Sequence, residues 1–402
     1  MSKILNRLWR ARIEQRRSKM KLIVVILSAL VVATSAKNAT FYTVEEAIKD
    51  HYIVVLKPGY DVEVIKKLLL TDLSGRFGDV SIKHTYTAAI NGFSAKLTNT
   101  ALQKLLAREE IKYITEDGEI HPAAVASWGL DRIDQRSLPL DGAYKAKGCG
   151  SGVNVYVVDS GIYPDHLYYE GRASPAFDAV NDGRPFGIDC LGHGTHCAGT
   201  IGASMYGVAP NVNIYGLRVL DCSGSGQWSS LIAACDYLVN FGVKPAVASM
   251  SIGGPANTAA DEAVQRVIQS GISVVASARN ANSPTSACSS SPAGVQEAIT
   301  VGATDINDRR ADYSNYGTCV DLFAPGNDIK SLWIGKPDDT RTQSGTSVST
   351  THVTGAVALL LAKNPNLSPA DIKATLIDTS TKNAISDLPS DTENRLLYVP
   401  RD

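Results

Sequence analysis

The chain has 402 residues, carries 39 basic and 40 acidic side chains, and has a formal net charge of −1. This length allows two or three domains of ordinary size and a substantial core. Because the charges balance, the sequence shows no sign of the basic surface that nucleic-acid-binding proteins require, and we expect no nucleic-acid partner.

The N-terminal region has the layout of a secretory signal peptide. In "MKLIVVILSALVVATSA" a basic flank precedes an apolar run from Leu22 to Ala33, and small residues end at Ala36. The apolar run is shorter than a comfortable transmembrane helix. We therefore expect residues 1–36 to be a signal peptide, with Met20 as an alternative start, and the processed protein to be extracellular and free of the membrane. A signal anchor is the alternative interpretation.

Residues 51–120 alternate short strand and helix patterns. Apolar runs predict strands in "HYIVVL", "INGFSAKL" and "IKYITE". Helical spacing predicts helices in "VEVIKKLLL" and in "TNTALQKLLARE", which Thr98 or Asn99 would cap. These patterns indicate a small α+β domain within residues 37–122. The small residues of "DGEIHPAAVAS" then indicate a linker.

From about Trp128 the pattern changes to α/β. Continuous apolar runs predict strands in "VNVYVVD", "VNIYGLRVL", "AVASMSI" and "ISVVASA". Helices are expected in "HGTHCAGTIG", "SSLIAACDYLVN", "TAADEAVQRVIQS" and "SVSTTHVTGAVALLLAK". Strands of this kind, separated by helices, predict a mostly parallel sheet flanked by helices over residues 123–402. Sites in such folds lie at the carboxyl ends of strands.

Three polar residues stand where such a sheet presents side chains. Asp159 ends "VNVYVVD", His193 opens a helix in "LGHGTHCAG", and Ser347 opens another in "SGTSVSTTHVTG". A serine hydroxyl becomes nucleophilic when a base accepts its proton, histidine titrates near neutral pH, and a carboxylate fixes the histidine tautomer. Taken singly, each residue has a simpler interpretation: a turn aspartate, a metal pair of His193 with His196, and a helix cap.

The motifs "VVDSG", "GHGTHCAG" and "SGTSVSTTHVTG", in this chain order, resemble those of subtilisin-like serine proteases, in particular the proteinase K and aqualysin branch. The resemblance covers about residues 128–400, and residues 51–120 resemble the inhibitory propeptide of the family. It implies a secreted endopeptidase made as a zymogen. Residues 37–122 would be a ferredoxin-like propeptide that inhibits its own chain, and residues 123–402 a monomeric peptidase domain that acts on polypeptides.

The resemblance also assigns site residues. Asp159 would orient His193, His193 would act as general base and then acid, and Ser347 would attack the scissile carbonyl. Asn280 would donate a hydrogen bond to the oxyanion, with Asn282 as the rival donor. The substrate would lie between an edge of Gly224, Ser225, Gly226 and Trp228 and an edge of Ser251, Ile252 and Gly253, with Ser277, Ala278 and Arg279 forming the far wall of the first pocket.

The seven cysteines indicate disulfides and, because the number is odd, at least one free thiol. By resemblance, four of them would form the disulfides Cys190–Cys222 and Cys288–Cys319. Cys197, one turn beyond His193, would be a buried free thiol that confers sensitivity to mercurials. Cys235 lies in an apolar helix pattern and is expected to be buried, and Cys149 in "AKGCGSG" is expected to be exposed.

The resemblance implies one structural metal ion. Asp321 in "CVDLFAPG" matches a calcium ligand of the family, whose companions would be backbone carbonyls near Gln296 and Ala298. One carboxylate with carbonyl oxygens suits a hard cation such as calcium. The ion would stabilise the fold and take no part in the reaction, and no organic cofactor is implied.

Arg279 and Thr351 are among the positions that depart from the family pattern. Arg279 stands where the family has glycine, directly before Asn280, and Thr351 stands where it has proline, four residues after Ser347. If the backbone at residue 279 has positive φ, the arginine is strained, and its side chain alters the first pocket. The leading interpretation is therefore an active endopeptidase with an altered first pocket. The alternative is a catalytically silent relative that acts as a binding or regulatory protein.

Overall fold

The computed structural model describes residues 38–44, 47–73, 80–118 and 125–401. The chain forms two compact units, Met1–Pro122 and Ala123–Asp402. The expected signal peptide and the centre of the expected linker lie outside the described residues. Of the helices within these ranges, none is both long and apolar enough to cross a membrane.

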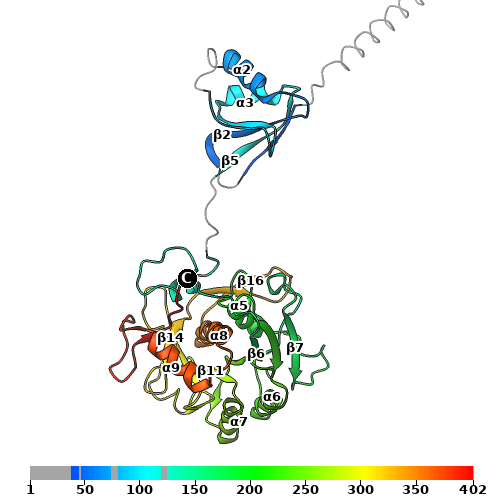
Figure 1. The fold of residues 1–402 in the computed structure, drawn as a ribbon. Helices are drawn as coiled ribbons and strands as arrows, with labels where there is room; N and C mark the ends of the chain where they lie inside the picture. The colour runs from blue at the N-terminus through cyan, green and yellow to red at the C-terminus, as the bar shows by residue number, and fades with distance from the viewer. Residues whose placement is uncertain (1–37, 45–46, 74–79, 119–124, 402) are drawn as a thin grey trace, which may run out of the picture. The chain divides into compact units, whose positions relative to one another are not determined.

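The described part of the first unit is a five-stranded sheet with the order β1–β5–β2–β4–β3 and two helices (Figure 1). Its elements are β1 (Thr40–Tyr42), β2 (Ala47–Leu56), α2 (Val62–Leu73), β3 (Ser81–Tyr86), β4 (Gly92–Lys96), α3 (Asn99–Leu106) and β5 (Ile111–Gly118). β1 is parallel to β5, and the other neighbours are antiparallel. Ile65 of α2 and Leu105 of α3 share one core with Val54 and Phe93 of the sheet. Both helices therefore cover the same face, which confirms the predicted ferredoxin-like α+β domain.

The second unit is built on a nine-stranded sheet with the order β17–β18–β14–β13–β11–β9–β6–β8–β7. Its strands are β6 (Asn154–Asp159), β7 (Ala173–Asp178), β8 (Asn213–Arg218), β9 (Ala246–Met250), β11 (Ser273–Ser277), β13 (Ile299–Thr304), β14 (Leu322–Pro325), β17 (Thr381–Lys382) and β18 (Arg395–Leu396). All neighbours are parallel except β17 and β18. The mostly parallel sheet is thus confirmed, and β7, β13, β14, β17 and β18 extend it beyond the four strands expected.

The other elements of this unit are helices and short strand pairs. They are α4 (Trp128–Ile133), the 3₁₀ turn η1 (Leu167–Tyr169), α5 (His193–Gly202), α6 (Trp228–Phe241), β10 (Gly254–Pro255), α7 (Thr258–Gln269), β12 (Ser290–Ser291), β15 (Ile329–Leu332), β16 (Thr340–Gln343), α8 (Thr346–Lys363) and α9 (Pro369–Thr379). β10 pairs with β12, and β15 pairs with β16.

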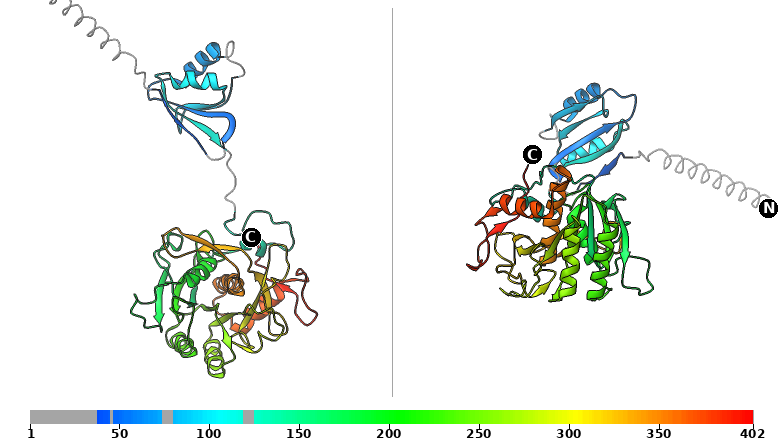
Figure 2. Two further views of the ribbon diagram at one scale, coloured as in Figure 1. Left: turned by 180° about the vertical axis from the view of Figure 1, so that it is seen from behind. Right: turned by 60° about the horizontal axis from the view of Figure 1, so that its bottom comes forward.

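Helices cover both faces of the large sheet. Because side chains alternate along β6, Val155 and Val157 share a core with α5, α8 and α9, whereas Tyr156 and Val158 share another with α6 and α7. In Figures 1 and 2, α8 lies in the middle of the unit and α6 and α7 lie together at its edge. The large sheet is therefore the middle layer of three.

Helix α8 runs through the core although its first half is polar. Fourteen of its 18 residues are buried. Thr350 Oγ1 donates to the carbonyl of Thr346 (2.7 Å), and Thr354 Oγ1 donates to that of Thr350 (2.9 Å). Thr351, in place of the proline of the family, donates to the carbonyl of Val348 (2.6 Å) and continues the helix. The threonine hydroxyls are thus satisfied within the helix, which allows this polar segment to be buried.

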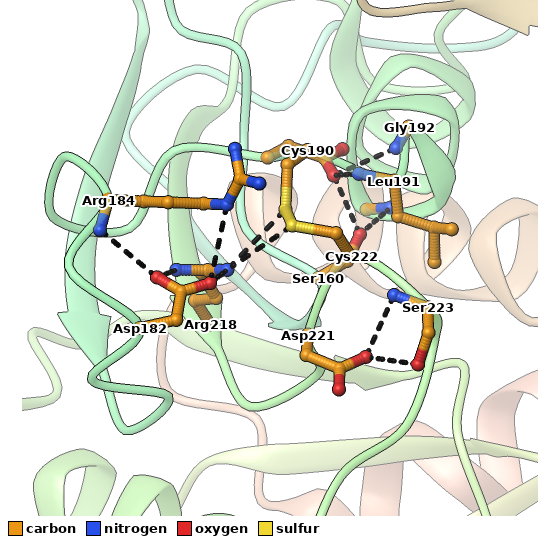
Figure 3. The surroundings of a disulfide bond; sticks show 12 residues. Ser160, Asp182, Arg184, Cys190, Leu191, Gly192, Arg218, Asp221, Cys222 and Ser223 are labelled. Atoms are coloured by element: carbon orange, nitrogen blue, oxygen red, sulfur yellow. Dashed lines mark hydrogen bonds and ion pairs between the residues drawn. A yellow bond between two sulfur atoms is a disulfide. The ribbon is translucent and has the colours of Figure 1, made fainter.

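Two disulfides, Cys190–Cys222 and Cys288–Cys319, tie loops of this unit together. Figure 3 shows the first beside the guanidinium of Arg218, which is buried. Arg218 Nη2 lies 2.6 Å from Asp182 Oδ2 and 3.4 Å from Cys190 Sγ. This disulfide joins the loop that precedes α5 to the loop that follows β8. It therefore constrains the segment that leads to His193.

Candidate active site

Asp159 and His193 meet at the carboxyl end of β6. Asp159 is the last residue of β6 and is fully buried, and His193 is the first residue of α5. His193 Nδ1 lies 2.8 Å from Asp159 Oδ1 and 2.9 Å from Oδ2, and the backbone N–H of Ser160 donates to Oδ1 (2.7 Å). The carboxylate thus favours the tautomer with the proton on Nδ1 and leaves Nε2 as the basic nitrogen.

Two opposing effects set the pKa of His193. Burial lowers the pKa, because the charged imidazolium loses water. The Asp159 carboxylate, which is hydrogen-bonded to Nδ1, raises it by more, and the pKa ends well above its ordinary value. A histidine in this setting binds a proton readily, as a general base must.

Two glycines around His193 let α5 approach its neighbours. A Cβ atom on Gly194 would lie 2.2 Å from the carbonyl oxygen of Gly161. A Cβ atom on Gly192, whose φ is +99°, would lie 2.4 Å from Cζ2 of Trp333. Both distances are far shorter than van der Waals contact. The pattern "GHG" is therefore explained by close packing around the histidine.

Ser347 and Asn280 face the same space. Ser347 is the second residue of α8, and Asn280 follows the end of β11. A Cβ atom on Gly345 would lie 2.9 Å from Ser347 Oγ and 3.4 Å from Asn280 Nδ2. Asn280 Oδ1 accepts hydrogen bonds from the backbone N–H of Thr346 (3.0 Å) and from its hydroxyl (2.9 Å). These bonds fix the amide so that its NH₂ group points away from Thr346.

Asn282, the rival donor, lies outside this arrangement. Its backbone N–H donates to the carbonyl of Tyr313 (2.9 Å), and its side chain does not line the pocket that contains Ser347. The role of Thr346 in holding Asn280 was missed from the sequence, although a hydroxyl directly before Ser347 is a visible feature.

Within the described residues, no hydrogen bond joins Ser347 to His193. The backbone carbonyl of Ser347 accepts a bond from Ser251 Oγ (2.9 Å), which anchors the start of α8 to one of the predicted edges. Contacts between a nucleophile and its base are often long without substrate and tighten when it binds. The described residues therefore form two pairs of the candidate active site, Asp159 with His193 and Ser347 with Asn280.

The three free cysteines differ in their surroundings. Cys197 is buried with its Sγ 3.9 Å from His193 Nδ1, and burial raises the pKa of its thiol. Burial also raises the pKa of Cys235, to about 12. Cys149 is partly exposed, and hydrogen bonds with Ser151 lower the pKa of its thiol. The buried Cys197 is therefore a neutral neighbour of the histidine rather than a thiolate nucleophile.

Two adjoining pockets lie along the predicted edges, and both are lined by Ile252 and Gly253. The first pocket, of about 280 Å³, is lined by Ser251, Ile252, Gly253, Ser277, Arg279, Asn280, Ala281, Thr346 and Ser347. The second pocket, of about 220 Å³, is lined by Val219, Leu220, Gly224, Gly226, Gln227, Trp228, Leu231, Ile252, Gly253, Gly254 and Pro255.

Two predicted substrate-binding residues do not line these pockets. Ala278 is fully buried, and its backbone N–H donates to the carbonyl of Val301 (2.9 Å), so its side chain belongs to the core. Ser225 is exposed, and its backbone N–H donates to Asp221 Oδ1 (3.0 Å) in a turn. Strand alternation explains the first correction, because Ser277 and Ala278 point to opposite sides of the sheet.

Arg279 combines a strained backbone with a side chain that borders the first pocket. Its φ is 72°, in the left-handed region, which costs about 1–3 kcal/mol for a residue other than glycine. Its Cγ and Cδ each lie 3.4 Å from the position that a Cβ on Gly253 would take. Its Nη1 donates to Ser290 Oγ (3.1 Å), a partner that no local sequence pattern indicates.

The structure corrects the interpretation of Asp321 as a calcium ligand. Asp321 Oδ2 and the carbonyl oxygens of Gln296 and Ala298 do converge, but on Lys373 Nζ, at 2.8, 2.8 and 2.7 Å. An ammonium group has three donors, and each of these oxygens accepts one. The ligand set therefore does not fit calcium, because the lysine nitrogen stands at its centre. No local pattern predicts this, since Lys373 lies on α9, 75 and 77 residues from the two carbonyls.

Comparison with known proteins identifies both units. Residues 150–395 match the subtilase family, and residues 51–123 match the peptidase inhibitor I9 family. The chain is 44% identical over 389 residues to an extracellular serine proteinase of Thermus sp. (strain Rt41A), covering 92% of this chain and 94% of that one. It is 40% identical over 368 residues to an alkaline serine exoprotease A of Vibrio alginolyticus, covering 88% of this chain and 68% of that one.

A solved structure agrees. A cold-adapted subtilisin-like serine proteinase matches with a TM-score of 0.66 and 48% sequence identity, covering 69% of this chain and 100% of that one. The family matches, the solved structure and the named relatives therefore indicate the same class of protein. The chain belongs to the subtilase family of serine proteases and carries an inhibitor I9 domain ahead of its peptidase domain.

Proposed function

We propose that this protein is a secreted serine endopeptidase whose nucleophile is Ser347, with His193 as base, Asp159 as its orienting group and Asn280 as oxyanion donor. One observation carries the proposal: Ser347 Oγ and Asn280 Nδ2 face the same space. A nucleophile and a fixed neutral donor around one point are what acyl transfer needs.

The proposed reaction starts with attack of Ser347 Oγ on the scissile carbonyl carbon. His193 Nε2 takes the hydroxyl proton, and Asp159 stabilises the imidazolium through Nδ1. The carbonyl oxygen becomes an oxyanion that accepts bonds from Asn280 Nδ2 and from the backbone N–H of Ser347, one of the first N–H groups of α8, which have no partner in the helix. His193 then gives its proton to the leaving amine. A water molecule attacks the acyl-enzyme by the same steps and releases Ser347.

The cleft suits an extended peptide. Glycines at 224, 226 and 253 allow close approach of a substrate backbone, which can pair with these edges as an added strand. Backbone pairing tolerates many sequences and leaves selectivity to the pockets. We assign no role to calcium at Asp321, and we propose a monomer without membrane contact.

The first unit is proposed to act as an intramolecular inhibitor. Residues 37–122 would block the cleft of residues 123–402 until the chain is cut between the units, after export directed by residues 1–36. The relative named as an extracellular serine proteinase supports export, and the match to the I9 inhibitor family supports inhibition by the first unit.

A fluorophosphonate probe tests the proposal. We expect it to label the processed wild-type protein and to leave Ser347→Ala unlabelled, because the probe reacts with an activated serine hydroxyl. Ser349→Ala is the matched control, since Ser349 lies two residues further along the same helix and is fully buried. Absence of labelling in correctly processed wild-type protein would refute the enzyme and favour the silent, binding relative.

A further inference from the structure

We propose that Arg279 makes the first pocket an acceptor for acidic side chains, so that the enzyme cleaves preferentially after aspartate or glutamate. The P1 residue, which precedes the cleaved bond, would place its carboxylate against the guanidinium. This inference rests on the proposed function, because it takes Ser347 as the attacking group at the mouth of the same pocket.

Among the residues that the structure describes, the charge of Arg279 has no counterion. Within the described part of the chain, no ion pair joins it to a carboxylate, and its one side-chain hydrogen bond goes to the neutral hydroxyl of Ser290. The buried arginines behave differently: Arg132 pairs with Asp308 at 2.6 Å, and Arg218 pairs with Asp182 at 2.6 Å. A guanidinium has five N–H donors. Four of those on Arg279 therefore remain for a ligand.

The pocket itself supplies no competing charge. Arg279 is the only charged residue among its nine described lining residues, and the others are serine, glycine, isoleucine, asparagine, alanine and threonine. A volume of about 280 Å³ remains with the arginine in place. This is below the range of about 300–1,000 Å³ typical of small-molecule sites and suits a single amino-acid side chain. An anionic group is the chemistry that this combination of size and charge favours.

The arginine is held in position before any substrate arrives. Ser290 is buried, and its hydroxyl donates to the carbonyl of Ser286, so a lone pair of Ser290 Oγ is directed to Arg279 Nη1. The stem of the side chain lies against Gly253 on the opposite wall. Anchoring at both places lowers the entropy lost when a carboxylate binds. A fixed guanidinium at this place gives the strained backbone of Arg279 a function in substrate binding.

The test compares matched P1 residues. Peptide substrates that differ only in P1 as glutamate, glutamine, aspartate, asparagine, alanine or phenylalanine are hydrolysed by wild type, Arg279→Met and Arg279→Gly. Glutamate and glutamine have nearly the same shape, so the ratio of their kcat/KM values measures charge recognition. Arg279→Met keeps a long side chain and the backbone strain but removes the charge.

For wild type we expect the glutamate-to-glutamine ratio of kcat/KM to be about 10 to 100, since charge-assisted hydrogen bonds are stronger than neutral ones. The ratio should fall to about 1 or below in Arg279→Met, and added salt should lower it in wild type alone. Arg279→Gly should gain activity on phenylalanine, because the pocket then opens.

A wild-type ratio below about 2 would overturn the inference. So would a preference for alanine over both glutamate and glutamine, which would mean that the arginine only fills space. Both results leave Ser347 labelled by the fluorophosphonate. Loss of that labelling would instead overturn the proposed function, and the two failures are therefore distinguishable.

Discussion

Replacing Lys373 by methionine should destabilise the peptidase unit. The change removes the ammonium group that contacts Asp321 Oδ2 at 2.8 Å and the carbonyls of Gln296 and Ala298 at 2.8 and 2.7 Å. Among the described residues, the Asp321 carboxylate then keeps the backbone N–H of Thr300 at 2.8 Å as its one direct donor. Breaking a buried ion pair costs about 3–5 kcal/mol. The two side chains are 20% and 19% exposed, so we expect about 2–4 kcal/mol here after discounting for solvent.

This free energy corresponds to a fall in Tm of roughly 3–7 °C for a unit of this size. Differential scanning calorimetry of processed protein inactivated with a sulfonyl fluoride measures it without autolysis. Lys336→Met is the control, because Lys336 is an exposed lysine outside this cluster. Lys373→Ala opens the space instead of filling it. A calcium-dependent rise in Tm that appears in this variant and exceeds that of wild type would show the oxygens accepting a metal once the ammonium is gone.

The pH dependence provides a second measurement. Burial raises the pKa of Asp321, and Lys373 counteracts this by lowering it. Removing Lys373 therefore raises the folded-state pKa further above the unfolded value, and the folded state binds the proton more tightly. The destabilisation is then largest at pH values above that pKa and shrinks as the carboxyl is protonated at acid pH. If the Tm of Lys373→Met lies within about 1 °C of the Tm of Lys336→Met at pH 7, the contacts of the ammonium do not stabilise the fold and the prediction is wrong.

Three further predictions concern the active site. Asn280→Ala should lower kcat by about 100- to 1000-fold with little change in KM, the range known for loss of this donor in subtilisin; an unchanged kcat would exclude Asn280 as oxyanion donor. Because Asp159 raises the pKa of His193, kcat/KM of wild type should increase with pH, and the midpoint of this increase should lie above the ordinary pKa of histidine. Asp159→Asn should move that midpoint to lower pH in the residual activity, and a profile that stays in place would refute the pairing. Cys197→Ala should retain activity but lose inhibition by mercurials, since its Sγ lies 3.9 Å from His193 Nδ1; persistent inhibition would indicate another thiol, such as Cys149.

The sequence predicts the parts of this fold that depend on local patterns. Apolar runs identify β6, β8, β9 and β11, and glycines beside His193 and Ser347 identify the helices that begin there. Both disulfides follow from the resemblance and are present in the structure. Strand β14 has only four residues and β18 only two, so neither is long enough to show a strand pattern in the sequence.

What the sequence could not predict are contacts between distant segments. Lys373 is a half-buried residue of α9, and nothing near it in the sequence indicates that its ammonium reaches carbonyls of another loop. Arg279 is next to Asn280 in the sequence, but the direction of its side chain depends on Ser290 and Gly253. Ala278 belongs to the expected pocket wall only by resemblance to the family, whereas its side chain packs in the core. These cases share one cause, since each depends on a packing partner that the local pattern does not contain.

Helix α8 has a consequence for how such an enzyme can diversify. It contacts α5, β9, β11 and β13 and is buried along most of its length, so Ser347 is held by the core. Arg279 belongs to a surface loop after β11, and it contacts Ser290 on a two-residue strand. Substitutions that change the pocket therefore need not disturb the nucleophile. The fold therefore separates the nucleophile, which the core holds in place, from the choice of substrate, which surface loops can alter one residue at a time.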